Sequence, residues 1–343
     1  MKTTDLAMTA RSLVADGKGI LAADETPPTM TKRLDARKIE STPDSRRAYR
    51  EMFFTTPGIA EFISGVILQD ETIRQRASKG TGLADLLAKQ GILPGIKVDL
   101  GAKPLAGSTG EKITEGLDGL RDRLKEYREI GARFAKWRAV IALSDTLPSP
   151  TCVQANAHAL ARYVALCQEV GVVPIVEPEV LMDGSHTIER CEEVTGIVLH
   201  EVFNALFDQK VSLEGMLLKP NMVISGKECA KQASVKEVAV ATLRCLSRHV
   251  PAAVPGIVFL SGGQDHLAAT MHLSAINQLE GPKPWKLTFS YGRALQDEAL
   301  RAWRGKNENL KAGQQAFYHR AMCDSAAALG RYTNAMEGRP ARA

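Results

Sequence analysis

The chain has 343 residues, a formal net charge of +5 and six cysteines without a Cys-x-x-Cys pair. The scattered cysteines argue against a disulfide framework and a zinc ribbon, and they favour reduced thiols in a cytoplasmic protein. The mild charge without a lysine or arginine block does not suggest nucleic-acid binding, and the lack of about 18 consecutive apolar residues excludes a membrane span.

The chain begins with a predicted helix, which is followed by a long series of strands and helices. Residues 1–20 mix acidic and basic side chains without an apolar core, so we expect no secretory signal. The first fifteen residues predict a helix that packs on the rest of the protein. Short apolar runs then alternate with amphipathic stretches of helical period, such as residues 151–170 and 234–249. In chain order, the eight predicted strands lie within residues 19–25, 62–68, 95–99, 134–141, 172–177, 215–219, 256–261 and 285–290.

This alternation of strand and helix predicts an α/β fold with a parallel sheet. Eight such units favour a closed (β/α)8 TIM barrel over an open sheet. No glycine-rich dinucleotide fingerprint follows the first strand, which argues against a Rossmann fold. We expect a single domain over residues 1–343, with the barrel over about 19–305. A helical C-terminal extension and tail then cover about 306–343, with helix near 310–332 and disorder over 337–343.

Charged side chains gather at the predicted C-terminal ends of the strands. Strand side chains alternate with a period of two, and those facing inward at these ends line the active site of such a barrel. A structural network of ion pairs would also explain a few such charges, but so many at one end of neighbouring strands favour chemistry. They are Asp24 on the first strand, Lys136 and Arg138 on the fourth, Glu177 and Glu179 on the fifth, and Lys219 on the sixth.

Among these side chains, Lys219 is the candidate nucleophile. Burial disfavours the ammonium form of a lysine, and like-charge repulsion from Lys136 would disfavour it further. A neutral amine forms a Schiff base with a carbonyl substrate. Glu177 and Glu179 could keep Lys136 cationic and move protons, and Asp24 could take a hydroxyl proton from the substrate. Together these groups suit cleavage of a carbon–carbon bond next to a carbonyl, with the protonated imine as the electron sink.

Two glycine-bearing segments predict an anion site. The seventh strand ends in Ser261-Gly262-Gly263, and the eighth ends in Ser290-Tyr291-Gly292-Arg293. Small residues let backbone N–H groups approach an anion, and arginine offers a fork of donors. The loops after strands seven and eight usually hold phosphate in a TIM barrel. Lys97 and Arg138 could bind a second anion on the other side of the barrel mouth.

Metal and cofactor binding are not predicted. The seven histidines include no pair at His-x-x-x-His or His-x-His spacing, so we expect no metal site among them.

At six places the sequence resembles class I fructose-1,6-bisphosphate aldolases, which are metal-free Schiff-base enzymes. The matching stretches follow the order of that family and span about residues 5–305, which is most of the chain. They read GKGILAADE (17–25), AKWR (135–138), VPIVEPE (173–179), LLKPNM (217–222), FLSGGQ (259–264) and FSYGRALQ (289–296).

The resemblance implies a cytoplasmic lyase of glycolysis and gluconeogenesis without a cofactor. The implied reaction is the reversible cleavage of fructose 1,6-bisphosphate to dihydroxyacetone phosphate and glyceraldehyde 3-phosphate. Lys219 would form the imine, Glu177 would transfer protons during imine formation, and Asp24 would be the base on the C4 hydroxyl. Glu179 and Lys136 would be supporting charges. The partners would be a sugar bisphosphate and further copies of the chain in a homotetramer, with neither nucleic acid nor membrane.

The resemblance also assigns the two phosphates and shows two departures. After Asp24, many family members read Glu-Ser-Thr-Gly-Ser, whereas Pro27 and Pro28 here remove backbone donors and stiffen the loop. The chain as given lacks the terminal tyrosine of vertebrate members, so we expect Glu177 to carry proton exchange. The implied ligands of the C1 phosphate are Ser261, Gly262, Ser290, Gly292 and Arg293; those of the C6 phosphate are Lys97, Arg138, Thr26 and Thr29.

Other functions stay open from the sequence alone. A Schiff-base lyase of the same architecture could act on a different phosphorylated ketose. A silent sugar-phosphate binder would have no use for the three groups Lys219, Glu177 and Asp24. A zinc-dependent aldolase would need ligand spacings that the histidines lack.

Overall fold

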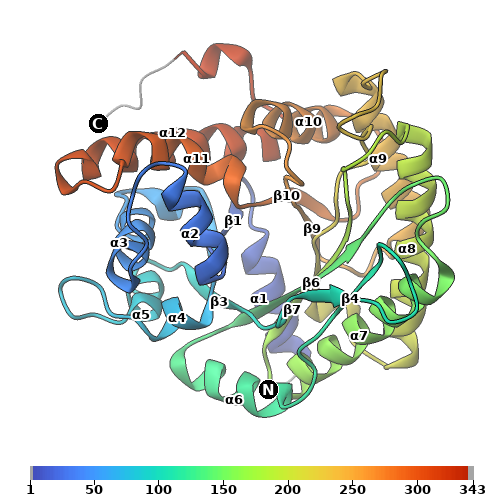
Figure 1. Ribbon diagram of the computed structural model, residues 1–343, viewed down its shortest axis with the longest axis horizontal. Helices are drawn as coiled ribbons and strands as arrows, with labels where there is room; N and C mark the ends of the chain where they lie inside the picture. The colour runs from blue at the N-terminus through green and yellow to red at the C-terminus, as the bar shows by residue number, and fades with distance from the viewer. Residues whose placement is uncertain (1–2, 339–343) are drawn as a thin grey trace.

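A computed structural model describes residues 3–338 of the chain. Its eight barrel strands are parallel and close on themselves, with helices around the outside, which confirms the predicted (β/α)8 barrel (Figure 1). Around the barrel the strand order is β1-β10-β9-β8-β7-β6-β3-β2. The strands are β1 (Gly19–Ala22), β2 (Ile63–Leu68), β3 (Leu93–Lys97), β6 (Phe134–Ile141), β7 (Val173–Val180), β8 (Leu217–Leu218), β9 (Gly256–Phe259) and β10 (Lys286–Tyr291).

The helices cover the outer face of the barrel, so almost every strand residue is buried on one side or the other. Side-chain caps start several of them: Ser149 accepts a hydrogen bond from the N–H of Cys152, and Ser234 forms a capping box with Glu237. The helices are α1 (Thr3–Leu13), α2 (Pro27–Asp35), α3 (Pro43–Phe54), α4 (Asp70–Arg74), α5 (Leu83–Ala88), α6 (Leu120–Ile130), α7 (Pro150–Glu169), α8 (Ile188–Asp208), α9 (Val235–His249), α10 (His266–Gln278), α11 (Arg293–Trp303) and α12 (Leu310–Ala328). Short 3-10 turns are η1 (Ile59–Glu61), η2 (Leu213–Gly215), η3 (Asn307–Asn309) and η4 (Asn334–Met336).

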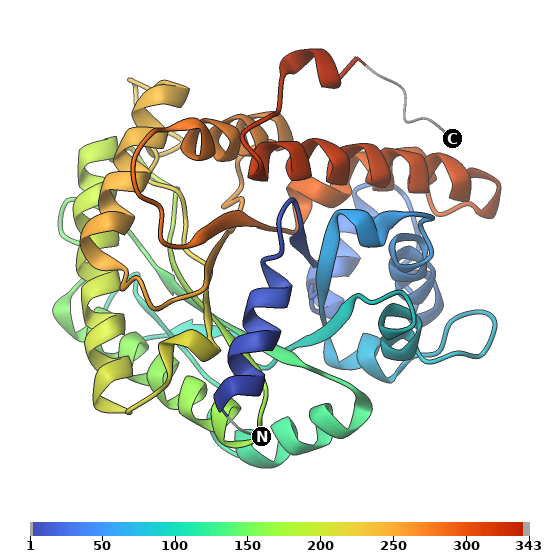
Figure 2. The same ribbon diagram turned by 180° about the vertical axis from the view of Figure 1, so that it is seen from behind.

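The predicted N-terminal helix is α1, and it closes the N-terminal end of the barrel. Figure 2 shows it lying across the middle of the barrel on this side. Its buried Leu6, Ala10 and Leu13 share one apolar cluster with inward side chains of the strands, among them Phe134 and Val258. The interior below the mouth is therefore packed with side chains, as in other barrels of this class.

Close packing inside the barrel depends on Gly95. A Cβ at this position would lie 2.3 Å from the ring of Phe134. We therefore expect Gly95→Ala to destabilise the protein by about 1–3 kcal/mol, the usual cost of overpacking a core. Thermal unfolding would measure this as a lower apparent Tm. Gly338→Ala is the matched control, because its Cβ would meet nothing within 4 Å. Equal Tm values for the two variants would contradict this account of the packing.

The structure has one element that was not predicted. An antiparallel hairpin of β4 (Ala102–Pro104) and β5 (Lys112–Thr114) lies in the loop after β3. The helical extension is α12, and the chain then turns back to η4 (Figure 1). Disorder was predicted from Glu337 onward, but this residue is held by Arg320 and Tyr332; residues 339–343 of that prediction lie outside the described part. No helix within residues 3–338 is long and apolar enough to cross a membrane.

Candidate active site

A cavity of about 480 Å³ opens at the C-terminal ends of the barrel strands. The structure brings all of the predicted site residues together in its wall, although they come from seven different strands or strand ends. These residues are Asp24, Thr26, Thr29, Lys97, Lys136, Arg138, Glu177, Glu179, Lys219, Ser261, Gly262, Gly263, Ser290, Gly292 and Arg293.

Two lysines and two carboxylates form the buried centre of this cavity. The Nζ atom of Lys136 lies 2.7 Å from Oδ2 of Asp24 and 3.1 Å from Oε2 of Glu177. The other oxygen of Glu177 lies 3.2 Å from Nζ of Lys219. Side chains of Lys136, Lys219 and Glu177 are each only 4% exposed. Glu177 thus links the two amines directly, and water has little access to either of them.

The charge states at this centre follow from the contacts. Burial alone would raise the pKa of Asp24, but Lys136 and Lys219 lower it to about 2. Burial would also raise the pKa of Glu177, and the neighbouring cations hold it below its usual value. Burial would lower the pKa of Lys136, but Asp24 and Glu177 raise it above the usual value. At neutral pH both carboxylates are therefore ionised and Lys136 is protonated.

The two lysines differ in how firmly they are held. Lys136 contacts two carboxylates, whereas Glu177 is the one carboxylate within 4.0 Å of Lys219 in the described part of the chain. Lys219 directly follows β8, and its N–H donates to the carbonyl of Val176 at 2.7 Å. Pro220 comes next and cannot continue the ladder as a donor. The backbone is therefore fixed at the strand end while the amine faces the cavity.

Further pairs lie nearer the mouth and differ from the expected ones. Glu179 was expected to hold Lys136, but its partner is Arg138, with Nε to Oε2 at 2.5 Å. Glu179 lies two residues beyond Glu177 on β7, so its carboxylate stands higher in the barrel. Lys97 contacts Asp99 at 2.6 Å. Sequence reasoning did not single out Asp99, although its acidic side chain follows the third strand at the parity of Lys97.

The predicted anion site has the geometry that small residues allow. Gly262 and Gly263 have φ of 59° and 85°, a region that favours glycine. Ser290 is buried, and its Oγ has no hydrogen-bond partner within residues 3–338. Gly292 directly precedes α11, whose N-terminus attracts anions. Arg293 completes the group: its Nη2 would lie 3.4 Å from a Cβ built on Gly263.

A further cation at this anion site was not predicted. Nζ of Lys227 would lie 3.2 Å from the same Cβ position on Gly263, and it contacts Asp183 at 3.0 Å. In the sequence, Lys227 lies eight residues after Lys219 and directly follows a glycine. This closeness to the candidate nucleophile is the signal that could have identified it. Lys227 and Asp183 both line the cavity.

The segment after Asp24 is helical from its first proline. Thr26 is the N-cap of α2, and Pro27 and Pro28 occupy its first turn, where proline is tolerated because these N–H groups lack helical partners. The loop expected from the two prolines is thus a helix start that lacks two backbone donors. Oγ1 of Thr26 and Oγ1 of Thr29 lie 3.1 Å apart. Lys32, one turn further on, also lines the cavity and was missed from the sequence.

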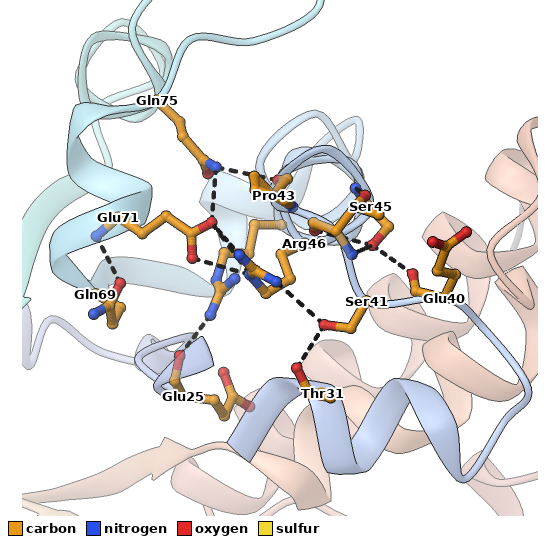
Figure 3. A network of polar contacts seen from close by, with 12 residues as sticks. Glu25, Thr31, Glu40, Ser41, Pro43, Ser45, Arg46, Gln69, Glu71 and Gln75 are labelled. Atoms are coloured by element: carbon orange, nitrogen blue, oxygen red, sulfur yellow. Dashed lines mark hydrogen bonds and ion pairs between the residues drawn. The ribbon is translucent and has the colours of Figure 1, made fainter. Parts of the chain in front are cut away.

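A network of polar contacts built on arginine side chains holds this segment in place (Figure 3). Arg46 on α3 binds both oxygens of Glu71 on α4 and donates to Ser41 at 3.2 Å. Ser41 in turn contacts Thr31 of α2 at 2.7 Å. Arg50 donates to the carbonyl of Glu25 at 2.7 Å and to that of Ala23 at 3.2 Å. The Ala23–Asp24 and Glu25–Thr26 peptide groups, on either side of Asp24, are therefore anchored.

A closed parallel barrel with two buried lysines and ionised carboxylates at its mouth is typical of one class of protein, the barrel enzymes with a lysine nucleophile. The comparisons with known proteins agree. A family model described as class-I fructose-bisphosphate aldolase matches residues 5–343. The chain belongs to the class I fructose-bisphosphate aldolase family, as the sequence resemblance predicted, and members of this family are Schiff-base lyases.

Individual relatives match over nearly the whole chain. A Xanthomonas campestris protein named probable fructose-bisphosphate aldolase class 1 is 56% identical over 333 residues, which cover 97% of this chain and 99% of that one. Arabidopsis thaliana fructose-bisphosphate aldolase 4, cytosolic, is 52% identical over 332 residues, covering 97% and 84%. The solved structure of the Plasmodium falciparum aldolase, in complex with TRAP and a small-molecule inhibitor, has a TM-score of 0.95 at 48% identity, covering 97% and 96%.

Proposed function

We propose that the cavity cleaves fructose 1,6-bisphosphate reversibly into dihydroxyacetone phosphate and glyceraldehyde 3-phosphate, with Lys219 as the imine-forming residue. The observation that carries this proposal is the unequal pairing of the two buried amines. Lys136 is fixed as a cation by Asp24 and Glu177, whereas Lys219 has a single carboxylate neighbour. Lys219 is therefore the less firmly held amine of the two, and we assign it the attack on a carbonyl.

The first half of the reaction forms the imine. The amine of Lys219 adds to the C2 carbonyl of the open-chain sugar, and the resulting carbinolamine loses its hydroxyl group as water. Glu177 lies 3.2 Å from the amine, so it can pass the proton released by the attack to the C2 oxygen. One further proton, taken from solvent, completes the departing water and leaves the imine protonated. Lys136 contacts the same carboxylate and favours its ionised form.

The second half breaks the C3–C4 bond. Asp24 takes the proton of the C4 hydroxyl, the C4 carbonyl forms, and the bonding electron pair moves into the protonated imine to give an enamine. Glyceraldehyde 3-phosphate leaves. The proton held by Asp24 passes through Lys136, which contacts both carboxylates, to Glu177, and Glu177 gives it to C3. Water then hydrolyses the new imine, which releases dihydroxyacetone phosphate and the proton taken up when the first imine formed. Each proton taken up by a carboxylate is given back within one cycle, so no cofactor is needed.

The two ends of the cavity would hold the two phosphates. The C1 phosphate suits the glycine turn at Gly262–Gly263, the free hydroxyl of Ser290 and the fork of Arg293. The C6 phosphate suits the opposite wall, where Lys97 and Arg138 lie near the first turn of α2. There the hydroxyls of Thr26 and Thr29 are the donors left by Pro27 and Pro28, which have no N–H groups.

Arg293→Ala is expected to raise KM for the bisphosphate by roughly 10- to 100-fold, because losing a charge-assisted hydrogen bond costs about 1.5–3 kcal/mol. Steady-state kinetics would measure this change. Arg301→Ala is the matched control, since Arg301 lies on the same helix but not in the cavity wall. A KM for Arg293→Ala that equals the control value would place the C1 phosphate elsewhere.

Borohydride reduction in the presence of dihydroxyacetone phosphate tests the proposed function directly. We expect one covalent adduct per chain, mapped by mass spectrometry to the peptide that carries Lys219. EDTA is expected to leave turnover unchanged, because the imine supplies the electron sink. An adduct on Lys136 instead would reassign the nucleophile. Activity that EDTA removes and zinc restores, without any adduct, would indicate a metal-dependent reaction.

Three further properties belong to this proposal. We propose that residues 1–343 form one domain, that the protein is cytoplasmic, and that it assembles as a homotetramer. The free thiols of all six cysteines and the cytosolic name of the Arabidopsis relative support the location. Analytical ultracentrifugation would measure the assembly, and a monomer at micromolar concentration would contradict it.

A further inference from the structure

A second cluster of reactive side chains lies outside the active-site cavity, where the C-terminal segment returns to α12. The chain reverses after this helix, so that η4 lies alongside it (Figures 1 and 2). His319 and Cys323 lie one turn apart on α12 and therefore share a face. Glu337 directly follows η4 and meets them there. The donor atoms of these three residues all lie within 4.8 Å of one another.

The imidazole of His319 is poorly satisfied by the protein. Its Nδ1 is buried and has no hydrogen-bond partner in the described part of the chain. Its Nε2 lies 3.8 Å from Sγ of Cys323 and 3.8 Å from Oε2 of Glu337. The distance to the carboxylate is too long for a hydrogen bond, and a thiol is a weak partner. Nε2 of His319 thus faces a thiol and a carboxylate but forms no good hydrogen bond with either, which suggests that these three groups share a ligand.

The spacing of the three donors fits a divalent metal ion. Zinc binds cysteine sulfur at about 2.3 Å, histidine nitrogen at about 2.0–2.1 Å and carboxylate oxygen at about 2.0–2.2 Å. Tetrahedral angles then place neighbouring ligand atoms about 3.3–3.6 Å apart. The separations of 3.8 Å from Nε2 of His319 to Sγ of Cys323 and to Oε2 of Glu337 need to shrink by only a few tenths of an ångström.

The surroundings are suited to hold such an ion. Nη2 of Arg320 contacts both oxygens of Glu337 at 2.5 Å, and the hydroxyl of Tyr332 donates to Oε1 at 2.8 Å. These contacts orient the carboxylate so that Oε2 faces His319, which is the task of the groups around a metal ligand. A thiolate on Cys323 would supply one negative charge to a divalent ion, and the carboxylate of Glu337 would be shared between the ion and Arg320.

We propose that His319, Cys323 and Glu337 bind one zinc ion, or a similar borderline cation such as cobalt(II), and so fasten the C-terminal segment to α12. A sulfur–nitrogen–oxygen donor set favours these ions over magnesium and calcium. Three protein ligands leave a fourth position for water. None of the three residues lines the active-site cavity, so the ion acts on the fold and takes no part in the cleavage reaction. The histidine spacings considered in the sequence did not include a His-x-x-x-Cys pair.

The test uses the full-length chain without an affinity tag, stripped of metal and titrated with zinc against a chromophoric chelator. We expect one equivalent to bind. Cys323→Ser should weaken binding by more than about 100-fold, beyond the 10- to 100-fold typical of losing an outer partner of a ligand. Cys229→Ser is the control, because it removes a partly exposed thiol that lies outside the cluster. Titration with cobalt(II) should give a thiolate charge-transfer band that Cys323→Ser removes and Cys229→Ser keeps.

Two further measurements, thermal unfolding and turnover with and without zinc, also test the site. Zinc should raise the apparent Tm of the wild type, through preferential binding to the folded state, but not that of Glu337→Gln. That substitution changes a residue of the C-terminal segment and spares the helix, so it covers the case in which Cys323→Ser does not fold. Aldolase turnover should be the same with and without zinc. Less than one equivalent bound, or a cobalt band that survives Cys323→Ser, would show that the cluster is only an ion-paired anchor for the C-terminal segment.

Discussion

Lys219→Ala is expected to abolish both cleavage of fructose 1,6-bisphosphate and borohydride trapping, while the barrel stays folded. Removing a nucleophile removes the covalent route altogether, and losses of 10⁴-fold or more are typical of such changes. The fold should survive because Glu177 keeps its contact with Lys136, so its carboxylate is not left buried without a partner. Progress assays and intact-mass spectrometry after reduction would measure the two losses.

A control for Lys219→Ala must remove an amine from the same cavity without touching the proposed chemistry. Lys227→Ala does this, because Lys227 lies at the mouth beside Gly263 and contacts Asp183 instead of the buried carboxylates. Because Lys227 lies at the proposed anion site, the variant is assayed at saturating dihydroxyacetone phosphate, where it should still form the adduct. Normal turnover by Lys219→Ala would refute the assignment of the nucleophile, and an adduct formed by that variant would place the imine on Lys136.

Glu177→Gln is expected to lower kcat by about 10²- to 10⁴-fold, the range typical of losing a general acid or base. Glutamine keeps the shape of the side chain but cannot accept and return a proton. Because Glu177 has no place among the proposed phosphate ligands, KM should change little. The adduct at Lys219 should still form under borohydride, but more slowly, since imine formation itself needs proton transfer.

Glu179→Gln provides the comparison for Glu177→Gln. The two glutamates lie two residues apart on β7, yet Glu179 contacts Arg138 near the mouth instead of either buried lysine. We expect its main effect on KM, through a less firmly held Arg138, with a smaller loss in kcat. A kcat for Glu177→Gln within tenfold of the wild type would move the proton transfer to another group, of which Asp24 is the nearest candidate.

The barrel could be predicted from the sequence because strands covered by helices on one face and by the interior on the other read as continuous apolar runs. The hairpin of β4 and β5 escaped because three-residue strands at the surface carry too little pattern. Strand β8 has only two residues but could still be predicted. Met216 to Leu218 form an apolar run that leads directly to Lys219.

The membership of the candidate site could be predicted, but its pairing could not. Alternation along a strand tells which side chains face inward, so Glu177 and Glu179 both appeared as possible partners of Lys136. Their different heights along β7 decide that one meets the buried lysines and the other meets Arg138. Lys227 was missed for a related reason: it lies beyond the strand end, in a loop whose course cannot be read from alternation.

The helix that closes the N-terminal end of the barrel limits the traffic of small molecules. With Leu13 and its apolar neighbours packed beneath the reacting groups, substrate and both products share one doorway. In the proposed mechanism, the half of the sugar bound as an enamine on Lys219 is tethered, whereas the aldehyde is free to diffuse. Departure therefore has a fixed sequence: glyceraldehyde 3-phosphate goes first, and dihydroxyacetone phosphate follows once hydrolysis has released it.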